Sequence, residues 1–200
     1  MEKNDVAMTI LGLAASPRRG GNSEKLLDRF LAGARRAGGR TERIALAGLR
    51  VDGCRACISC EVSGQCIVAD GFHSLNARLI AADIIALSSP VFFAGLPAGA
   101  KAVVDRAQCQ WMRKFRLHLP LALTASGRSR RRGVLLAVAG DPHASFDGLK
   151  KTVKYFFDVY ETDYWADLLL PGIDGKGEIE AHPDALQEAF ELGQRSVREV

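Results

Sequence analysis

Short apolar segments alternate with longer amphipathic segments along the chain. The apolar runs have the length of strands and are bounded by glycine, proline or polar residues, which is typical of strands buried on both faces of a sheet. They predict five strands, at about residues 8–15, 43–46, 83–88, 133–140 and 164–170. Other segments repeat apolar residues at i, i+3, i+4 spacing, as on one face of a helix. These predict five helices, at about residues 24–38, 72–82, 98–111, 144–160 and 184–200.

The alternation of strands and helices defines the expected architecture. No internal repeat or low-complexity linker interrupts it, and 200 residues suit one α/β domain. We therefore expect residues 1–200 to form a single domain with a doubly wound parallel sheet in a three-layer α/β/α arrangement. For five strands the leading choice is the flavodoxin-like order 2-1-3-4-5, which places a ligand site above the carboxyl ends of strands one, three and four.

The loop after the first strand has the composition of an anion site. Residues 16–23 read Ser-Pro-Arg-Arg-Gly-Gly-Asn-Ser, and we expect Asn22 or Ser23 to cap the following helix. A helix N-terminus presents free N–H groups and a positive dipole end, which favour a phosphate. An ordinary capped turn is the alternative, but it would not need the two arginines. The spacing matches neither a Rossmann nor a Walker loop, so we expect a phosphate loop of another kind.

Two further loops are expected at the same edge of the sheet. They follow strands three and four, at residues 90–95 and 140–145, and both contain glycine and proline. Because the carboxyl ends of parallel strands share one edge, all three loops should converge there. Their convergence indicates a phosphorylated, flat and partly apolar ligand.

The three loops resemble those of the NADPH-dependent FMN reductase family. Residues 16–23 are similar to its phosphate loop, residues 88–93 to its second flavin loop, and residues 101–106 to the Lys-x-x-x-Asp-Arg motif that follows. The resemblance implies that FMN is bound by Ser16, Arg18, Asn22 and Ser23 at the phosphate, Pro90, Val91, Phe92 and Phe93 along the isoalloxazine ring, and Ala139, Gly140 and Asp141 at its far edge. Many relatives have Tyr where this chain has Phe92. No catalytic side chain is expected, because the cofactor carries the chemistry.

Four of the five cysteines lie close together, in a loop of about residues 50–70 inserted after the second strand. Cys54, Cys57, Cys60 and Cys66 follow the pattern Cys-x2-Cys-x2-Cys-x5-Cys. Three thiolates at this interval can cover one face of a cubane and a short turn can return the fourth, so we favour a [4Fe–4S] cluster. Free thiols or a labile disulfide are the main alternative. Structural zinc is less favoured because it more often uses two separated knuckles.

The cysteine spacing further resembles the iron-sulfur flavoprotein branch of the same family. The resemblance implies that the cluster exchanges single electrons with FMN, with NAD(P)H as a candidate donor. A ferredoxin-like protein, a quinone or a small molecule would be the acceptor, and the chain would form a homodimer or homotetramer. The alternatives are a cluster-free NAD(P)H-dependent FMN or quinone reductase, a non-enzymatic flavodoxin-like electron carrier, and a redox-sensing module. Cys109 lies outside the motif, and we expect it only to pack on its helix.

The composition of the chain argues against nucleic-acid-binding, secreted and membrane-spanning classes of protein. The net charge of +4 is too mild to mark a nucleic-acid binder, and we expect the basic residues 128–132 to form a solvated loop. For Lys101, Asp105 and Arg106, an ion pair on the helix surface and a functional role are equally expected. The polar residues 1–5 do not read as a signal peptide, and no segment reaches the roughly 20 apolar residues of a membrane span. Clustered cysteines in a chain without a signal peptide favour a location in the cytoplasm. We expect neither nucleic acid nor a membrane as a partner of the protein.

Overall fold

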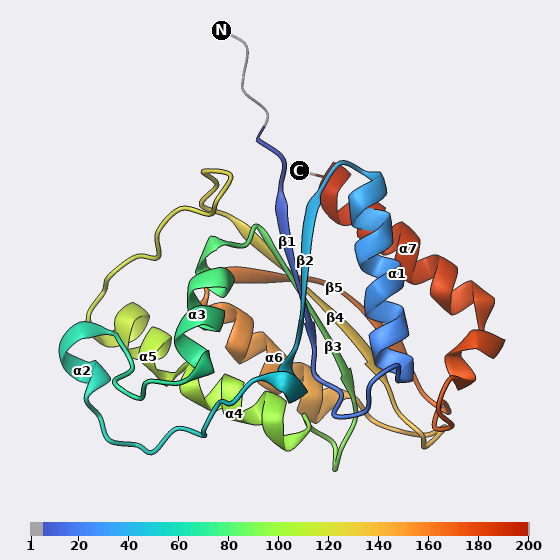
Figure 1. Cartoon of the computed structure of the whole chain (residues 1–200), viewed down its shortest axis with the longest axis horizontal. Coiled ribbons are helices and arrows are strands. Elements are labelled where there is room, and N and C mark those ends of the chain that lie inside the picture. The colour runs from blue at the N-terminus through green and yellow to red at the C-terminus, as the bar shows by residue number, and fades with distance from the viewer. Residues whose placement is uncertain (1–5, 200) are drawn as a thin grey trace, which may run out of the picture.

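A parallel sheet of five strands runs through the centre of the molecule (Figure 1). The computed structural model describes residues 6–199, so residues 1–5, on which the signal-peptide expectation rests, and Val200 lie outside the described part. The strands are β1 (Thr9–Ala14), β2 (Arg40–Ala45), β3 (Ile84–Pro90), β4 (Arg131–Val138) and β5 (Thr162–Leu170). Their order is β2-β1-β3-β4-β5 and all neighbours are parallel. The predicted flavodoxin-like topology is confirmed.

Helices cover both faces of the sheet and make three layers (Figure 1). One face carries α1 (Asn22–Arg36) and α7 (Pro183–Arg198), and the other carries α3 (Gly71–Ala81), α4 (Ala98–Arg106) and α6 (Asp147–Val159). The shorter elements are α2 (Cys60–Ser63), α5 (Gln108–Trp111), the π-helical turn η2 (Met112–Arg116), and the 3-10 turns η1 (Leu46–Gly48) and η3 (Glu178–Ala181). Within residues 6–199, no helix combines the length and apolar character that a membrane crossing requires.

The side chains of the strands contribute to two separate apolar cores, one on each face of the sheet. Along β1, Leu11 and Leu13 pack toward α3, α4 and α6, whereas Ile10 and Ala14 pack toward α1 and α7. This alternation follows from the two-residue period of a strand. Each fully buried leucine contributes about 2 kcal/mol to the free energy of unfolding. The continuous apolar runs of the sequence therefore correspond to strands covered on both sides.

Helices α1 and α7 touch through their backbones. A Cβ atom added at Gly33 would lie 1.9 Å from the carbonyl oxygen of Phe190, and one at Gly193 would lie 2.0 Å from the carbonyl oxygen of Phe30. Only glycine fits at these two positions. The contact fixes α1, whose N-terminus forms part of the site described below.

Some predicted element boundaries are wrong. The helix predicted from residue 144 begins only at Asp147, and the irregular cysteine segment contains the short helix α2. Arg131 and Arg132 belong to β4 rather than to a solvated loop. The side chain of Arg131 is 1% exposed, and its guanidinium donates to the carbonyl oxygens of Ile80 and Ala122. These two acceptors explain why a charged residue is tolerated inside the structure.

Candidate functional site

The loop after β1 leads directly into the N-terminus of α1. Gly21 is the N-cap residue, and within the described residues no side chain caps this helix. The predicted capping role of Asn22 or Ser23 is therefore wrong, because both residues lie inside the first turn. The first N–H groups of a helix have no intrahelical acceptor and point out of its N-terminal end. The loop thus faces a set of free donors, which suits an anion.

The side chain of Asn22 binds a distant segment instead. Its amide nitrogen donates to the carbonyl oxygen of Gly175 at 2.8 Å. Its carbonyl oxygen accepts the N–H groups of Gly177 at 3.0 Å and Ile179 at 3.3 Å. Asn22 thereby ties the loop after β5 to the start of α1 and brings a fourth loop to this edge of the sheet.

The interior of the first loop is kept open by its small residues. A Cβ atom at Gly21 would lie 3.1 Å from the carbonyl oxygen of Arg18 and 3.4 Å from Oγ of Ser16. The carboxylate of Glu24 accepts the N–H of Gly20, which closes the loop from behind. The space that a side chain at Gly21 would fill is left free, and the exposed Arg18 lies at its rim.

The loop after β3 is a tight and strained turn. Phe92 and Gly95 exchange two backbone hydrogen bonds, of 3.0 and 2.9 Å. The two residues between them, Phe93 and Ala94, have φ angles of +48° and +60°. Left-handed backbone costs a non-glycine residue about 1–2 kcal/mol, and such strain is concentrated at functional sites. Phe93 is 107% exposed at the tip of this turn.

These loops surround a hollow of about 100 Å³. Eight residues predicted to bind FMN line it, and they are Ser16, Arg18, Asn22, Ser23, Pro90, Val91, Phe92 and Gly140. Further lining residues that the sequence analysis did not name are Pro17, Gly21, Val138, Ile173 and Asp174. The hydroxyl, guanidinium and helix N-terminus at one end suit a phosphate, and the apolar residues at the other suit a flat ring. The donor set therefore fits FMN.

Three of the predicted residues lie outside the lining of this hollow. Phe93 points away at the tip of its turn, Ala139 is buried, and the carboxylate of Asp141 accepts the N–H of His143 at 2.8 Å. Conversely, Ile173 and Asp174 were missed although they follow the carboxyl end of β5. A Cβ atom at Gly140 would lie 3.0 Å from the side chain of Asp174, so the two loops are in contact. The shared edge of all parallel strands was the signal that could have included this loop.

The second candidate site is the cysteine loop between β2 and α3. Its base is closed by a backbone hydrogen bond of 3.0 Å from the N–H of Gly71 to the carbonyl oxygen of Arg50. The N–H of Asp52 also donates to the carboxylate of Asp70 at 3.1 Å. Asp70 caps α3 at the same time, by accepting the N–H of Phe72 at 2.9 Å. The loop therefore leaves the body of the protein and returns to it at one place.

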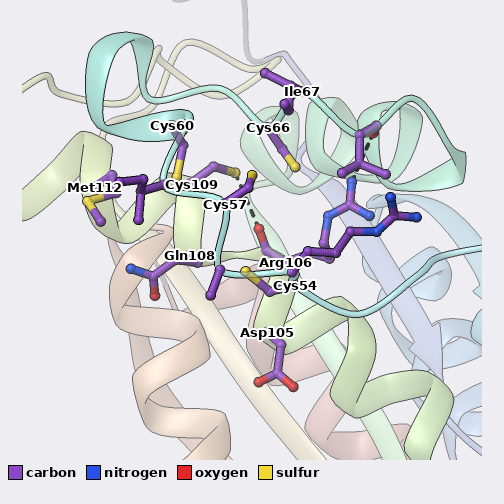
Figure 2. A pocket seen from close by; sticks show the side chains of 14 residues that line it. Cys54, Cys57, Cys60, Cys66, Ile67, Asp105, Arg106, Gln108, Cys109 and Met112 are labelled. Atoms are coloured by element: carbon purple, nitrogen blue, oxygen red, sulfur yellow. Dashed lines mark hydrogen bonds between the residues drawn. The ribbon is translucent and has the colours of Figure 1, made fainter.

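The interior of this loop is folded by left-handed residues. Ala56 and Ile58, on either side of Cys57, have φ angles of +51° and +55°, and Gly64 has +68°. The resulting turns bring Cys54, Cys57, Cys60 and Cys66 to the wall of one cavity of about 330 Å³ (Figure 2). All four are free thiols. A cavity walled by four thiols at cluster spacing fits the predicted iron-sulfur group.

The thiols of this cavity differ in their environments. Hydrogen bonds from the backbone and side chain of Ser59 lower the pKa of Cys57, whereas burial raises the pKa of Cys60. Among residues 6–199, no three Cys, His, Asp or Glu side chains are arranged to hold a single metal ion. In a cubane each thiolate binds its own iron, so the four ligands stand farther apart than those of one ion.

Three residues of the opposite wall were not expected to belong to this site. Cys109 is buried as predicted, but it also lines the cavity, together with Arg106 and Met112 (Figure 2). Its thiol donates to the carbonyl oxygen of Arg106 at 3.4 Å. Burial raises the pKa of Cys109 to about 11, and the neighbouring Cys66 and Cys60 act in the same direction. Arg106, Cys109 and Met112 are three residues apart in sequence. This spacing could have indicated that they share one helical face.

The two sites and the topology define a class of protein. A phosphate-type loop at the N-terminus of α1, flanked by loops from β3 and β4 in a 2-1-3-4-5 sheet, is the arrangement of flavodoxin-like flavoproteins. More particularly, the profile of the NADPH-dependent FMN reductase family matches residues 8–143, and the chain belongs to this family. It is therefore an FMN-dependent oxidoreductase by family.

Individual relatives place the chain near the iron-sulfur flavoproteins. It is 28% identical over 151 residues to an iron-sulfur flavoprotein of Methanosarcina thermophila, across 76% of this chain and 72% of the relative. It is 34% identical over 101 residues to one of Methanocaldococcus jannaschii, across 50% of this chain and 52% of the relative, so it matches about half of that protein. Among solved structures, an NAD(P)H:quinone oxidoreductase from Methanothermobacter marburgensis has a similar fold, with a TM-score of 0.66 at 20% identity over 95% of this chain and 97% of that one.

Proposed function

We propose that this oxidoreductase is an iron-sulfur flavoprotein that passes single electrons between FMN and a [4Fe–4S] cluster. The observation that carries the proposal is the common cavity of Cys54, Cys57, Cys60 and Cys66. It is supported by the names of the curated relatives, which are iron-sulfur flavoproteins. When bound, the flavin supplies hydride and one-electron chemistry, and the cluster supplies one-electron chemistry.

On the flavin side, the chain binds and orients its cofactor. Ser16, Arg18, Ser23 and the N–H groups at the start of α1 would hold the phosphate, with Asn22 fixing the loop behind them. The strained turn of Pro90, Val91, Phe92 and Phe93 would lie along the ring, and Gly140, the member of residues 139–141 that lines the hollow, would bound its far edge. Phenylalanine at position 92 offers the ring no hydroxyl donor. Pro90 has no N–H, and the N–H groups of Val91 and Phe92 already donate to the carbonyl oxygens of Val138 and Gly95. The N–H groups of Phe93 and Ala94 would therefore be the donors of this turn that tune the potential of the ring.

On the cysteine side, the chain supplies four thiolates and a partly enclosed wall. Cys60 and Cys66 are half-buried while Cys54 and Cys57 are exposed, so electrons could enter or leave through the exposed side of the loop. NAD(P)H is the candidate donor, and a quinone, a small molecule or a ferredoxin-like protein is the candidate acceptor. We place the chain in a homodimer or homotetramer, in keeping with the resemblance.

Anaerobic purification, reconstitution with iron and sulfide, and a visible spectrum test this function. We expect flavin bands together with about four iron and four sulfide per chain, as a cubane requires. Cys57→Ser should abolish iron binding, whereas Val62→Ala, at an exposed position of the same loop, serves as the control and should retain it. Flavin bands without iron or sulfide would contradict the cluster. A colourless protein that rejects added FMN would contradict the whole assignment.

The second candidate is a cluster-free NAD(P)H-dependent FMN or quinone reductase. The likeness to the quinone oxidoreductase over nearly the whole of both chains favours it. Steady-state NADPH oxidation with a quinone separates the two candidates. Turnover that is unchanged in Cys57→Ser would favour the cluster-free enzyme, and a lack of turnover with any acceptor would favour an electron carrier.

A further inference from the structure

Arg106 is a buried cation beside the cysteine cavity. Its side chain is 1% exposed, so it is not part of an ion pair on the helix surface, which was one of the two alternatives that the sequence left open. The surface pair exists without it, since Lys101 binds Asp105 at 2.7 Å. Arg106 instead points inward, lies over the ring of Phe72 at 4.9 Å and lines the cavity. A buried charge requires partners, so its contacts reveal what it does.

The guanidinium closes the cysteine loop at its base. Two nitrogen atoms pair with the carboxylate of Asp70 at 2.7 and 3.2 Å. The same two nitrogens donate to the carbonyl oxygen of Asp52 at 3.1 Å and to that of Val68 at 3.0 Å. Asp52 precedes Cys54 and Val68 follows Cys66, so one side chain binds both ends of the cysteine segment. We call these contacts of Arg106 with residues 52, 68 and 70 the clasp.

One donor of this buried guanidinium is not used by the clasp. Nε of Arg106 is buried and has no hydrogen-bond partner among the described residues. The clasp occupies the other two nitrogens, and the side chain that carries Nε lines the cavity together with Cys66 (Figure 2). Burial lowers the pKa of Arg106, but the hydrogen bonds and charge of Asp70 and the charge of Cys66 outweigh it and raise the pKa overall. A buried donor without an acceptor is costly, and of the buried unpartnered atoms Arg106 Nε, Gln110 Oε1, Arg113 Nε and Arg131 Nε, it is Arg106 whose side chain lines the cysteine cavity.

We propose that Arg106 is the positioning residue of the cysteine site, holding both ends of the loop while its free Nε–H donates to the sulfur of Cys66 when the site is filled. This inference rests on the proposed function, and it adds a residue outside the cysteine motif. A cation that donates to a ligand sulfur stabilises the more negative, reduced state of a cluster. Lysine keeps the charge but has a single ammonium group, which cannot reach both loop ends, Asp70 and the sulfur together.

The clasp can be tested in protein that holds no cluster. Amide hydrogen exchange across residues 52–70 is compared in wild type, Arg106→Lys, Asp70→Asn and Lys101→Gln. Asp70→Asn should fold because asparagine still caps α3, and Lys101→Gln removes a cation from the exposed face of the same helix. Relative to wild type, we expect amide exchange in the loop to be at least tenfold faster in Arg106→Lys and in Asp70→Asn, and unchanged in Lys101→Gln. Equal protection in all four proteins would overturn the clasp.

The donation to Cys66 is tested in reconstituted protein, through the iron content and the midpoint potential of the cluster. Arg106→Lys should hold less iron, and the cluster that remains should have a more negative potential, whereas Lys101→Gln should match wild type. FMN affinity, read at the separate flavin site, shows that each variant is folded. An unchanged potential and iron content in Arg106→Lys would overturn the inference. Failure of wild type to bind iron and sulfide would overturn the proposed function and the donation to Cys66, while the exchange experiment would still decide the clasp.

Discussion

The side chain of Asn22 joins two segments that are 153 residues apart, by donating to the carbonyl oxygen of Gly175 at 2.8 Å. Replacement by alanine removes this bond and the two that its carbonyl oxygen accepts. We expect Asn22→Ala to lower the free energy of unfolding by about 2–3 kcal/mol, measured by urea denaturation. Asn22→Asp keeps the acceptor oxygen but loses the amide donor. Its free energy of unfolding should therefore lie between those of wild type and Asn22→Ala. An alanine variant as stable as wild type would contradict this role.

Arg18 is expected to contribute to flavin binding through the phosphate alone. Arg18→Ala should weaken FMN binding by about 1.5–3 kcal/mol, because a charge-assisted hydrogen bond is lost. Titration with riboflavin, which has no phosphate, is the control, and its affinity should not change. Arg19→Ala, at the exposed neighbouring position, should have a smaller effect on FMN. Equal losses with FMN and riboflavin would mean that Arg18 acts on the ring or on the fold.

The turn after β3 stores strain that a glycine would release. Ala94 has a φ angle of +60°, which costs alanine about 1–2 kcal/mol and costs glycine only backbone entropy. Ala94→Gly should therefore stabilise the flavin-free protein by about 0.5–1 kcal/mol in a denaturation experiment. The matched control is Ala102→Gly within α4, which should destabilise it by about 1 kcal/mol. Destabilisation by both variants would contradict the strain.

Asp70 should give the stability a distinct acid dependence. Burial raises its pKa, but hydrogen bonds from Arg106 and from the N–H groups of Phe72 and Asp52 outweigh burial and leave the pKa below its ordinary value. A carboxyl group with a lowered pKa contributes stability that is complete above its unfolded pKa of about 3.9 and is lost as the pH falls through the folded value.

The variant Asp70→Asn isolates this contribution. We expect it to be less stable than wild type by about 1.5–3 kcal/mol near neutral pH, with the difference shrinking below about pH 4. Urea denaturation of both proteins between acid and neutral pH measures the difference. The exposed Asp105→Asn is the control and should give a small difference at every pH. A constant gap between Asp70→Asn and wild type down to strong acid would exclude the ionised carboxylate as its source.

The sheet and the convergence of three loops could be predicted because they depend on local patterns. Two-residue alternation, apolar helix faces and loop composition are properties of neighbouring residues, and the strand order follows from few alternatives. The cap of α1 could not be predicted, because Asn22 prefers partners that are 153 residues away to the free N–H groups beside it. The burial of Arg106 could not be predicted either, because the carbonyl groups of Asp52 and Val68 that accept its hydrogen bonds are distant in sequence.

The clasp separates the cysteine segment from the rest of the architecture. The hydrogen bonds described above that close the base of the loop are made by residues outside 54–66, namely Arg50, Asp52, Val68, Asp70, Gly71 and Arg106. A chain in which residues 54–66 were exchanged for a short linker would therefore retain these contacts, the sheet and the flavin loops. In evolutionary terms, the cysteine segment could be gained, lost or replaced on this scaffold without rebuilding the flavin loops.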